Sequence, residues 1–253
     1  MKIILGGAMG RLCREIAAEA ISHGDEIVYG MDIAYTDQAM DFPMANSYDL
    51  IDCEADVLVD CSRPDGLSDL LRFIKAKKIP AVICTTGFTD AELKQISEAA
   101  EELPILRSGN MSLGINVLEH LVAQAAKALG DGYDVEIIER HHRMKVDSPS
   151  GTALMLYEAV KKGTGAEKTP VHGRYGRNEK RTNQEVGIHA VRGGTVTGEH
   201  EVAFYGMGEE IILTHRAENR SLFARGAVRA AAFLKGKQPG LYNMSHVVAE
   251  MLD

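Results

Sequence analysis

The chain has 253 residues, of which 45% are hydrophobic and 25% are charged, and its formal net charge is −8. This composition is typical of a globular protein with one large or two modest domains. The negative charge argues against general attraction to nucleic acid or anionic lipid, so an anionic ligand would need a local cluster of donors. The sequence has no apolar run long enough for a signal peptide or a membrane span, and its four cysteines form no C-x-x-C pair. We therefore expect a cytoplasmic protein with buried free thiols.

The first 108 residues alternate between apolar β-type runs and segments with helical periodicity. This alternation is typical of βαβ units on a parallel, Rossmann-like sheet. The expected strands are KIIL, EIVYGMD, DVLVDC, PAVICTT and PILRS, and the expected helices cover residues 11–23, 65–77, 89–103 and 113–129. The third helix should begin at a capping box formed by Thr89 and Glu92, and the fourth should end at Gly130.

From about residue 133 the sequence changes to long strand-like runs, most of them separated by glycine-containing turns. The runs are YDVEIIERHH, EVGIHAVRG, TVTGEHEVAFYG and EEIILTHRAE, with a helix at 152–162 and a polar loop at 172–185. They predict a second α+β domain with a mainly antiparallel sheet. The C-terminal segment is helical again, and we expect it to return to the first sheet. The expected domains are 1–110 with 220–253, and 111–219.

A glycine-rich turn, GGAMGR, follows the first expected strand and contains Gly6, Gly7 and Gly10. Glycines at this turn let the backbone approach a pyrophosphate, and the next helix supplies free N–H groups. Asp32 ends the second strand 22 positions after Gly10, a spacing that suits a bond to the ribose hydroxyls. Leu5 replaces the first glycine of the usual motif, and a tight turn without a ligand is the alternative. No arginine follows Asp32, which favours NADH over NADPH.

A cationic stretch, RHHRMK, is followed shortly by the turn SGT. His141 can exchange a proton near neutral pH, and Lys145 offers a fixed cation that can also donate a proton. Gly151 and Thr152 begin a helix, so their amides should form a seat for an anion. Together these groups would hold a small substrate with more than one carboxylate. The alternative is that Ser150 only caps the helix and the basic residues are solvated. No metal is expected, because no carboxylate or cysteine has ligand spacing and a lysine is close.

The stretch EIIERHHRMKVDSPSGTAL resembles the signature of the 4-hydroxy-tetrahydrodipicolinate reductases, also called dihydrodipicolinate reductases, almost residue for residue. The resemblance extends over nearly the whole chain through GGAMGR, DCSRPDG, CTTGF, GNMSLGIN, GEHEVAFYG, THRAENRSLFARGAVRAA and GLYNM. It implies reduction of the substrate to tetrahydrodipicolinate by NADH or NADPH, in diaminopimelate and lysine biosynthesis. It also implies the two-domain architecture and a homotetramer assembled through the sheets of the second domains.

Residue roles follow from the same resemblance, motif by motif. It implies that His141 is the acid–base group and Lys145 the proton donor. Lys145 would also bind the substrate, whose carboxylates would meet His142, Gly151 and Thr152. The cofactor would contact four segments of the first domain and one arginine near the hinge: Gly6, Gly7, Ala8, Met9, Asp32, Cys84, Thr85, Thr86, Ser108, Gly109, Asn110, Met111 and Arg220. The sequences CTT and GNM depart from commoner forms of the family, and this affects the expected cofactor preference more than the reaction.

Three other functions fit parts of the sequence. A related two-domain dehydrogenase for another small amino or keto acid would share the glycine turn, but it would not explain HHRMK followed by SGT. A regulatory protein that senses NADH without turnover would be distinguished by an absorbance assay. A nucleic-acid binder would use RYGRNEKR at 174–181, but this run has one aromatic residue and belongs to an acidic chain, which favours a solvated loop.

Overall fold

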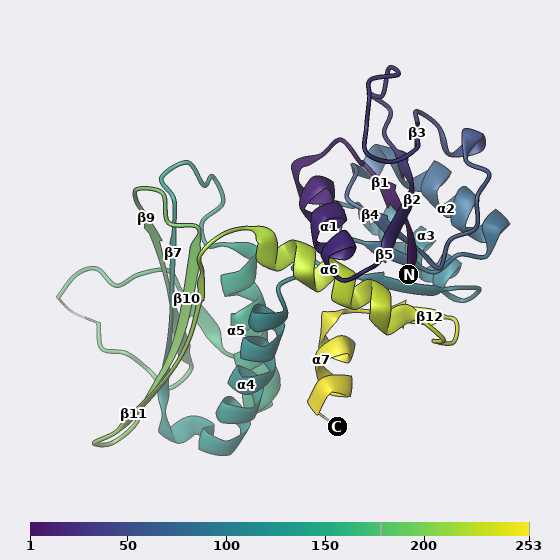
Figure 1. Ribbon diagram of the computed structural model, residues 1–253. Coiled ribbons are helices and arrows are strands. Elements are labelled where there is room, and N and C mark those ends of the chain that lie inside the picture. The colour runs from purple at the N-terminus through teal and green to yellow at the C-terminus, as the bar shows by residue number, and fades with distance from the viewer. Residues whose placement is uncertain (178, 253) are drawn as a thin grey trace. The chain divides into compact units, whose positions relative to one another are not determined.

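The computed structural model describes residues 1–177 and 179–252 (Figure 1). The chain divides into two compact units, which we call unit 1 (Met1–Leu113 with Ser221–Asp253) and unit 2 (Gly114–Arg220). Within the described ranges, no helix combines the length and the apolar composition needed to cross a membrane.

Unit 1 is built on a seven-stranded sheet in which all neighbouring strands are parallel. In spatial order the strands are β3 (Met44–Ala45), β2 (Glu26–Met31), β1 (Lys2–Gly6), β4 (Val57–Asp60), β5 (Ala81–Ile83), β6 (Pro104–Arg107) and β12 (Gly240–Tyr242). The direction of winding reverses between β1 and β4. In open α/β sheets of this order, ligands bind beyond the carboxyl ends of the strands at such a reversal.

Helices cover both faces of this sheet. They are α1 (Arg11–Ser22), α6 (Ser221–Leu234) and α7 (Met244–Leu252) on one face, and α2 (Leu67–Lys77) and α3 (Asp90–Ala100) on the other. Because side chains alternate along a strand, Ile3 and Leu5 of β1 join the core with α1 and α6, whereas Ile4 joins the core with α2 and α3. Both faces are therefore buried, which explains why the strands are continuously apolar.

Most elements of unit 1 lie where the sequence places them. α3 begins at the expected capping box, in which Thr89 Oγ1 accepts the Glu92 N–H at 3.3 Å and Glu92 Oε2 accepts the Thr89 N–H at 2.7 Å. α2 begins later than expected because Pro64–Gly66 form a 3-10 turn first. The strands β3 and β12 were not expected, since two or three residues are too few to show a periodicity.

Unit 2 contains a five-stranded sheet in the order β11-β10-β7-β9-β8. These strands are β7 (Asp134–His141), β8 (Thr169–Val171), β9 (Glu185–Arg192), β10 (Gly198–Tyr205) and β11 (Glu210–Ala217). β10 pairs antiparallel with β7 and β11, which confirms the expected mainly antiparallel sheet. β9 pairs parallel with β7 and β8, and these pairings were not expected. They are possible because a helix carries the chain back between β7 and β8, and the loop at 172–184 carries it back between β8 and β9.

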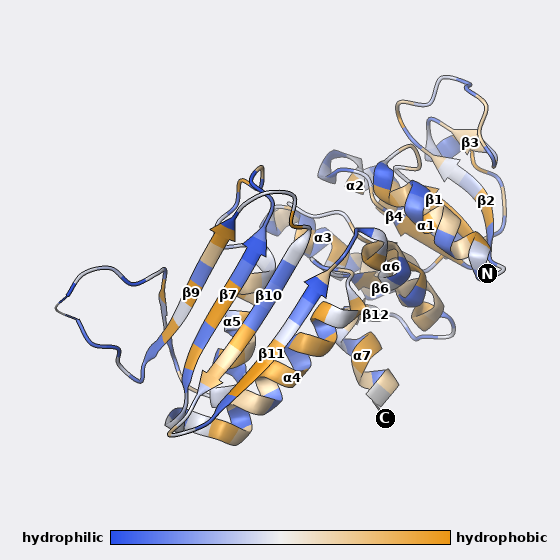
Figure 2. Ribbon diagram, turned by 60° about the vertical axis from the view of Figure 1, so that its left-hand side comes forward, coloured by the Kyte–Doolittle hydropathy of each residue, from blue (hydrophilic) through white to orange (hydrophobic). Residues whose placement is uncertain are grey.

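Two helices, α4 (Leu113–Leu129) and α5 (Gly151–Thr164), cover one face of this sheet (Figure 2). Their apolar side chains and those of the sheet form one core, which includes Leu118, Val122, Val135, Ile137, Leu156, Val160, Ile188, Val202 and Phe204. The helices approach closely at Gly163, where an added Cβ would lie 2.3 Å from the Ala123 carbonyl oxygen. The close packing of the two helices therefore depends on a glycine in the last turn of α5.

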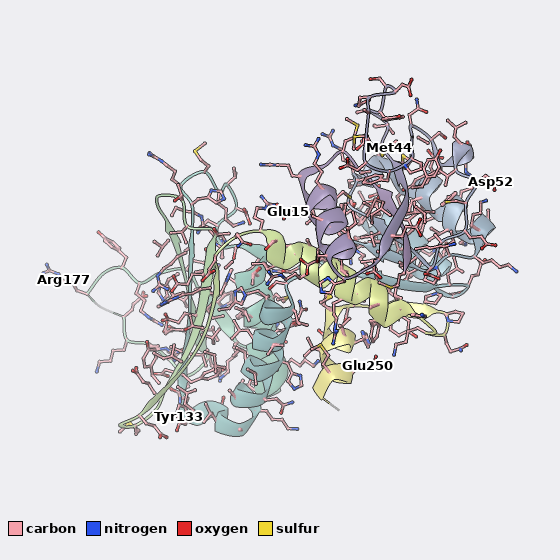
Figure 3. All side chains as sticks on the ribbon, viewed as in Figure 1. Glu15, Met44, Asp52, Tyr133, Arg177 and Glu250 are labelled. Carbon is pink, nitrogen blue, oxygen red and sulfur yellow. The ribbon has the colours of Figure 1, made fainter. Side chains whose placement is uncertain are left out.

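The opposite face of the sheet is polar over much of its area. On β7, Glu136 contacts His189 Nε2 at 2.8 Å and Arg181 Nε at 3.1 Å. Arg181 and Arg174 both belong to the expected polar loop, and Arg174 also pairs with an acid, on β9. Arg177 lies at the outer tip of this loop (Figure 3). The cations at both ends of the loop are thus held by carboxylates of unit 2.

Candidate active site

The glycine turn of unit 1 joins β1 to α1. Gly7 has a φ of +71°, and an added Cβ there would lie 2.9 Å from the Cys61 carbonyl oxygen and from the backbone of Ser62. Only glycine fits both the conformation and the space. Gly10 precedes α1 without a side-chain cap. The first-turn amides of α1 can therefore serve as donors to an anion.

Asp32 follows β2 and reaches back to the glycine turn. Its carboxylate accepts the N–H of Met9 and the N–H of Ala34, both at 3.0 Å. Each carboxylate oxygen has a second lone pair, so both can still accept a hydroxyl proton. The structure thus brings the turn and the acidic residue together.

The remaining candidate cofactor residues follow β5 and β6 directly. Because the strands are parallel, these residues share the carboxyl edge of the sheet with the glycine turn: Cys84, Thr85, Thr86, Ser108, Gly109, Asn110 and Met111. Thr85 is buried and its hydroxyl donates to Asp60 at 2.7 Å, and Met111 is also buried, so these two side chains support the site from within. Arg220 is exposed between β11 and α6, at the end of unit 2. All four cysteines are free thiols, but only Cys13 is buried as expected, whereas Cys53, Cys61 and Cys84 are half-buried.

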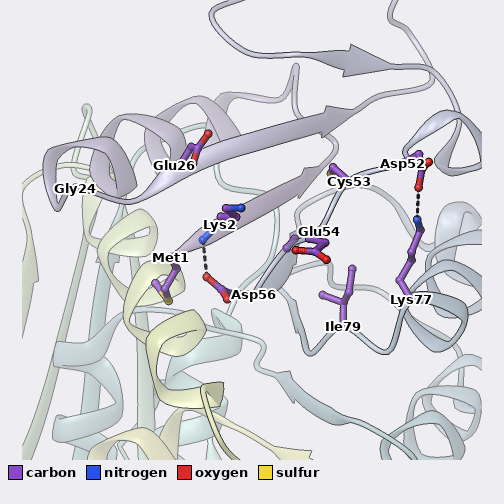
Figure 4. Close-up of a pocket in the computed structure, with 11 residues that line it drawn as sticks. Met1, Lys2, Gly24, Glu26, Asp52, Cys53, Glu54, Asp56, Lys77 and Ile79 are labelled. Carbon is purple, nitrogen blue, oxygen red and sulfur yellow. Dashed lines mark hydrogen bonds and ion pairs between the residues drawn. The ribbon is translucent and has the colours of Figure 1, made fainter.

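A separate hollow of about 780 Å³ lies at the amino edge of the same sheet (Figure 4). Two of its charged side chains, Lys77 and Asp52, pair at 2.9 Å, and the Asp56 carboxylate accepts the backbone N–H of Lys2 at 2.7 Å. No candidate site residue is among those that line it. We therefore assign no function to this hollow.

In unit 2, β7 places His141 at its carboxyl end. Alternation puts Glu139 and His141 on the same face as the core residues Val135 and Ile137. The Nδ1 atom of His141 lies 2.5 Å from a carboxylate oxygen of Glu139. On the other side of the ring, a Cβ added to Gly198 would lie 3.2 Å from Nε2. The glycine therefore leaves room at the second nitrogen.

Glu139 is 0% exposed, and its carboxylate is held by several donors. Arg192 donates from Nη1 and Nη2 to the two oxygens, each at 2.7 Å, and the Ser150 N–H donates at 3.0 Å. Burial acts to raise the pKa of Glu139, but hydrogen bonds from Arg192, His141 and Ser150 outweigh it and lower this pKa. Burial lowers the pKa of His141, although Glu139 acts to raise it. A neutral imidazole beside an ionised carboxylate carries its proton on Nδ1.

Lys145 lies in the turn that follows β7. Its N–H donates to the His142 carbonyl at 3.1 Å, and its ammonium pairs with Asp147 at 2.9 Å, which lowers the pKa of Asp147. The charge of Lys145 also helps to lower the pKa of His141. Lys145 and His142 are half-buried, so both remain accessible to a ligand.

The N-terminus of α5 lies next to His141. Ser150 caps the helix by accepting the Ala153 N–H at 3.2 Å, and Gly151 and Thr152 form its first turn. The Ser150 hydroxyl also contacts His200 Nε2 at 3.1 Å. Burial lowers the pKa of His200 to about 3, so this ring is neutral, and it packs edge-on against His141 with 5.1 Å between centroids.

Three residues of this arrangement were not identified from the sequence: Glu139, Arg192 and His200. For Glu139 a signal existed, because a residue two positions before His141 must share its face of the strand. Arg192 and His200 come from β9 and β10, and only the long-range pairing of those strands with β7 brings them to the site.

The sheet order, the glycine turn and the acid after β2 define unit 1 as a dinucleotide-binding fold, and the separate unit 2 places His141 beside the turn of Lys145 and the N-terminus of α5. The N-terminal model of dihydrodipicolinate reductase matches residues 1–111, and the C-terminal model matches residues 114–248. The chain belongs to the dihydrodipicolinate reductase family.

Similar proteins include the 4-hydroxy-tetrahydrodipicolinate reductases of Caldanaerobacter subterraneus subsp. tengcongensis, 45% identical and covering 98% of both chains, and of Clostridium tetani, 44% identical and covering 96% of this chain and 95% of that protein. Among solved structures, the dipicolinate-bound dihydrodipicolinate reductase from Paenisporosarcina sp. TG-14 has a TM-score of 0.80 at 24% identity, covering 96% of this chain and 97% of that one. These comparisons confirm the resemblance seen in the sequence and the fold class.

Proposed function

We propose that this chain catalyses the NAD(P)H-dependent reduction of 4-hydroxy-tetrahydrodipicolinate to tetrahydrodipicolinate, a step of diaminopimelate and lysine biosynthesis in the cytoplasm. The identity of the reaction is taken from the names of the relatives, which are 4-hydroxy-tetrahydrodipicolinate reductases. The observation that carries the proposal is the geometry at His141. A neutral imidazole, oriented by a buried carboxylate, lies beside the turn of Lys145 and the N-terminus of a helix. This combination suits a small dicarboxylate that must receive a proton.

The residues of unit 1 fit a dinucleotide, with uncapped α1 amides for the pyrophosphate and Asp32 for the ribose hydroxyls. We assign its contacts to Gly6, Gly7, Ala8, Met9, Asp32, Cys84, Thr85, Thr86, Ser108, Gly109, Asn110, Met111 and Arg220. When bound there, the nicotinamide supplies the hydride. The carboxylate of Asp32 would repel a phosphate on the ribose, and Ile33, Ala34 and Tyr35 offer no cation. These features support NADH as the preferred cofactor.

The substrate is assigned to unit 2, with its carboxylates on Lys145, His142 and the amides of Gly151 and Thr152. Dipicolinate, which is named in the Paenisporosarcina structure, is a ring with two carboxylates, and it supports a ligand of this charge. The Asp147 side chain that now pairs with Lys145 is 58% exposed, so a substrate carboxylate can replace it readily.

The overall reduction consumes a hydride and a proton and releases water. We assign the proton donation to Lys145 and the acid–base role to His141, which acts through Nε2 because Nδ1 is engaged by Glu139. Around these groups, the protein's contribution is to hold the ring, to neutralise its carboxylates and to keep the proton donor within reach.

We also propose that unit 2 is the oligomerisation domain of a homotetramer. The sheet face away from α4 and α5 carries Val191, Tyr205 and Ile212, which are 48%, 39% and 45% exposed. Apolar side chains on an uncovered sheet support assembly through this face. Light scattering should give the mass of four chains, and Ile212→Lys should reduce it.

The reaction is tested by adding the purified chain to pyruvate and aspartate semialdehyde with the preceding synthase, and following nicotinamide absorbance with NADH and with NADPH. We expect oxidation of the cofactor only when the synthase is present. His141→Gln and Lys145→Met should each lower kcat by about 10²-fold or more. His189→Gln, on the opposite sheet face, is the matched control and should keep activity. No oxidation by the wild type with either cofactor would refute the proposal.

A further inference from the structure

The least explained group in unit 2 is the buried carboxylate of Glu139. A fully buried acid is rare in proteins unless it is paired, and this one meets four donors: Arg192 Nη1, Arg192 Nη2, the Ser150 N–H and His141 Nδ1. Two of these donors belong to the groups that the proposed reaction needs. His141 is the acid–base residue, and Ser150 directly precedes the two amides that receive the substrate carboxylate.

We propose that Glu139 is a positioning residue that fixes the tautomer of His141 and, through the same carboxylate, the place of the α5 N-terminus relative to that ring. The inference rests on the proposed function, since it assigns Glu139 a part in the reaction of His141. Arg192 assists Glu139 by keeping its carboxylate ionised. The result is an imidazole with its proton on Nδ1 and its Nε2 directed to the space beside Gly198.

The arrangement requires a carboxylate rather than an amide. One oxygen of Glu139 accepts from Ser150 N and Arg192 Nη2, and the other accepts from Arg192 Nη1 and His141 Nδ1. A glutamine must place its NH₂ group at one of these positions, where it faces a donor of Arg192. At the first position it loses the Ser150 bond. At the second it donates to His141 Nδ1 and moves the ring proton to Nε2. The second placement is preferred, because there the NH₂ group meets only one fixed donor and the imidazole can become an acceptor, so Glu139→Gln preserves volume while moving the ring proton of His141.

The strand offers a matched control. Glu136 also lies on β7 and also contacts a histidine and an arginine, His189 at 2.8 Å and Arg181 at 3.1 Å, but on the opposite face of the sheet. Glu136→Gln removes an equivalent charge from the same strand without touching His141. A general effect of losing a paired acid should appear in both variants, whereas a positioning effect should appear only in Glu139→Gln.

The test combines ¹⁵N spectra of the histidine rings in the protein without substrate with steady-state kinetics across pH. His141→Gln identifies the signals of His141. We expect Nδ1 to carry the proton in the wild type and in Glu136→Gln, and to lose it in Glu139→Gln. In that variant kcat should fall by about 10²-fold, whereas the dissociation constant for NADH should change by less than about twofold, because its assigned contacts are in other segments. The limb of the pH profile due to His141 should move to lower pH, since the carboxylate acts to raise the pKa of that ring.

Several results would overturn the inference. A proton on Nε2 of His141 in the wild type would do so without any variant, even if Glu139→Gln does not fold. An unchanged His141 signal, or an unchanged pH limb, in a folded Glu139→Gln protein would also do so. The proposed function fails separately: an inactive wild type whose His141 tautomer still depends on Glu139 would refute the reaction and leave the orientation of the ring established.

Discussion

The space at Nε2 of His141 leads to a specific prediction for Gly198→Ala. The added methyl carbon would lie 3.2 Å from Nε2 and 3.5 Å from Cδ2 of the ring. A proton-transfer partner must come within about 2.6–3.2 Å of that nitrogen, so the methyl group competes for the same space. The ring cannot turn away without losing its 2.5 Å contact with Glu139.

The expected magnitude follows from the role of the histidine. General acid–base catalysis contributes roughly 10²–10⁴ in rate, so losing access to Nε2 should lower kcat within that range, or raise the barrier by about 3–5 kcal/mol. The fold should tolerate the change, because Gly198 has no positive φ and alanine is better than glycine within a strand.

Steady-state assays with a thermal-unfolding control would measure the effect. Gly193→Ala is the matched variant: an added Cβ there has no neighbour within 4 Å among the described residues, and its N–H still donates to the His141 carbonyl. It should retain kcat within about twofold. A Gly198→Ala protein that is folded and turns over as fast as the wild type would show that Nε2 takes no part in the reaction.

Three further predictions concern stability and cofactor choice. Burial raises the pKa of Asp60 to about 6, so the folded protein loses stability as pH rises from about 4 through 6 and this carboxyl group ionises. In urea unfolding at pH 7.5, Asp60→Asn should therefore be more stable than the wild type by ~1–3 kcal/mol. A stability difference between the two proteins that does not narrow toward pH 4.5 would contradict this. Gly163→Ala, whose Cβ would meet the Ala123 carbonyl oxygen at 2.3 Å, should lower stability by ~1–3 kcal/mol, whereas Gly132→Ala, which meets nothing within 4 Å, should not. Asp32→Ala should weaken NADH binding at least about tenfold more than NADPH binding in fluorescence titrations, and equal losses would argue against a ribose contact.

The sequence predicts the fold well wherever the physical signal is local. Alternating apolar runs and helical periods identify the parallel strands and helices of unit 1, and α4 ends at Leu129, before Gly130, as expected. Pairing between distant strands has no such signal. The parallel placement of β9 beside β7 depends on the crossover through α5, and the short β12 forms only because it adds to the edge strand β6.

The same distinction applies to the candidate site. His141, Lys145 and the start of α5 lie within one short stretch of sequence, so their residue types alone suggest an anion site with a proton donor. Arg192 is 51 positions after His141 in the chain. It meets Glu139 only because β9 aligns with β7 so that Arg192 is the register partner of His141. The charge balance of the site was therefore not predictable without the strand register.

Unit 1 is interrupted by unit 2 along the chain, and this has a consequence for how the protein is made. One core of unit 1 combines residues from β1 and β4 with Ala227, Ala231 and Leu234 of α6. Once the first 113 residues have been made, α1 can cover part of this sheet face, but the part that packs against α6 is still exposed. Unit 2 is contiguous and can finish folding first. That apolar surface stays exposed until the last thirty or so residues have been synthesised. A stop codon that removes only these residues should therefore be far more damaging than its late position suggests.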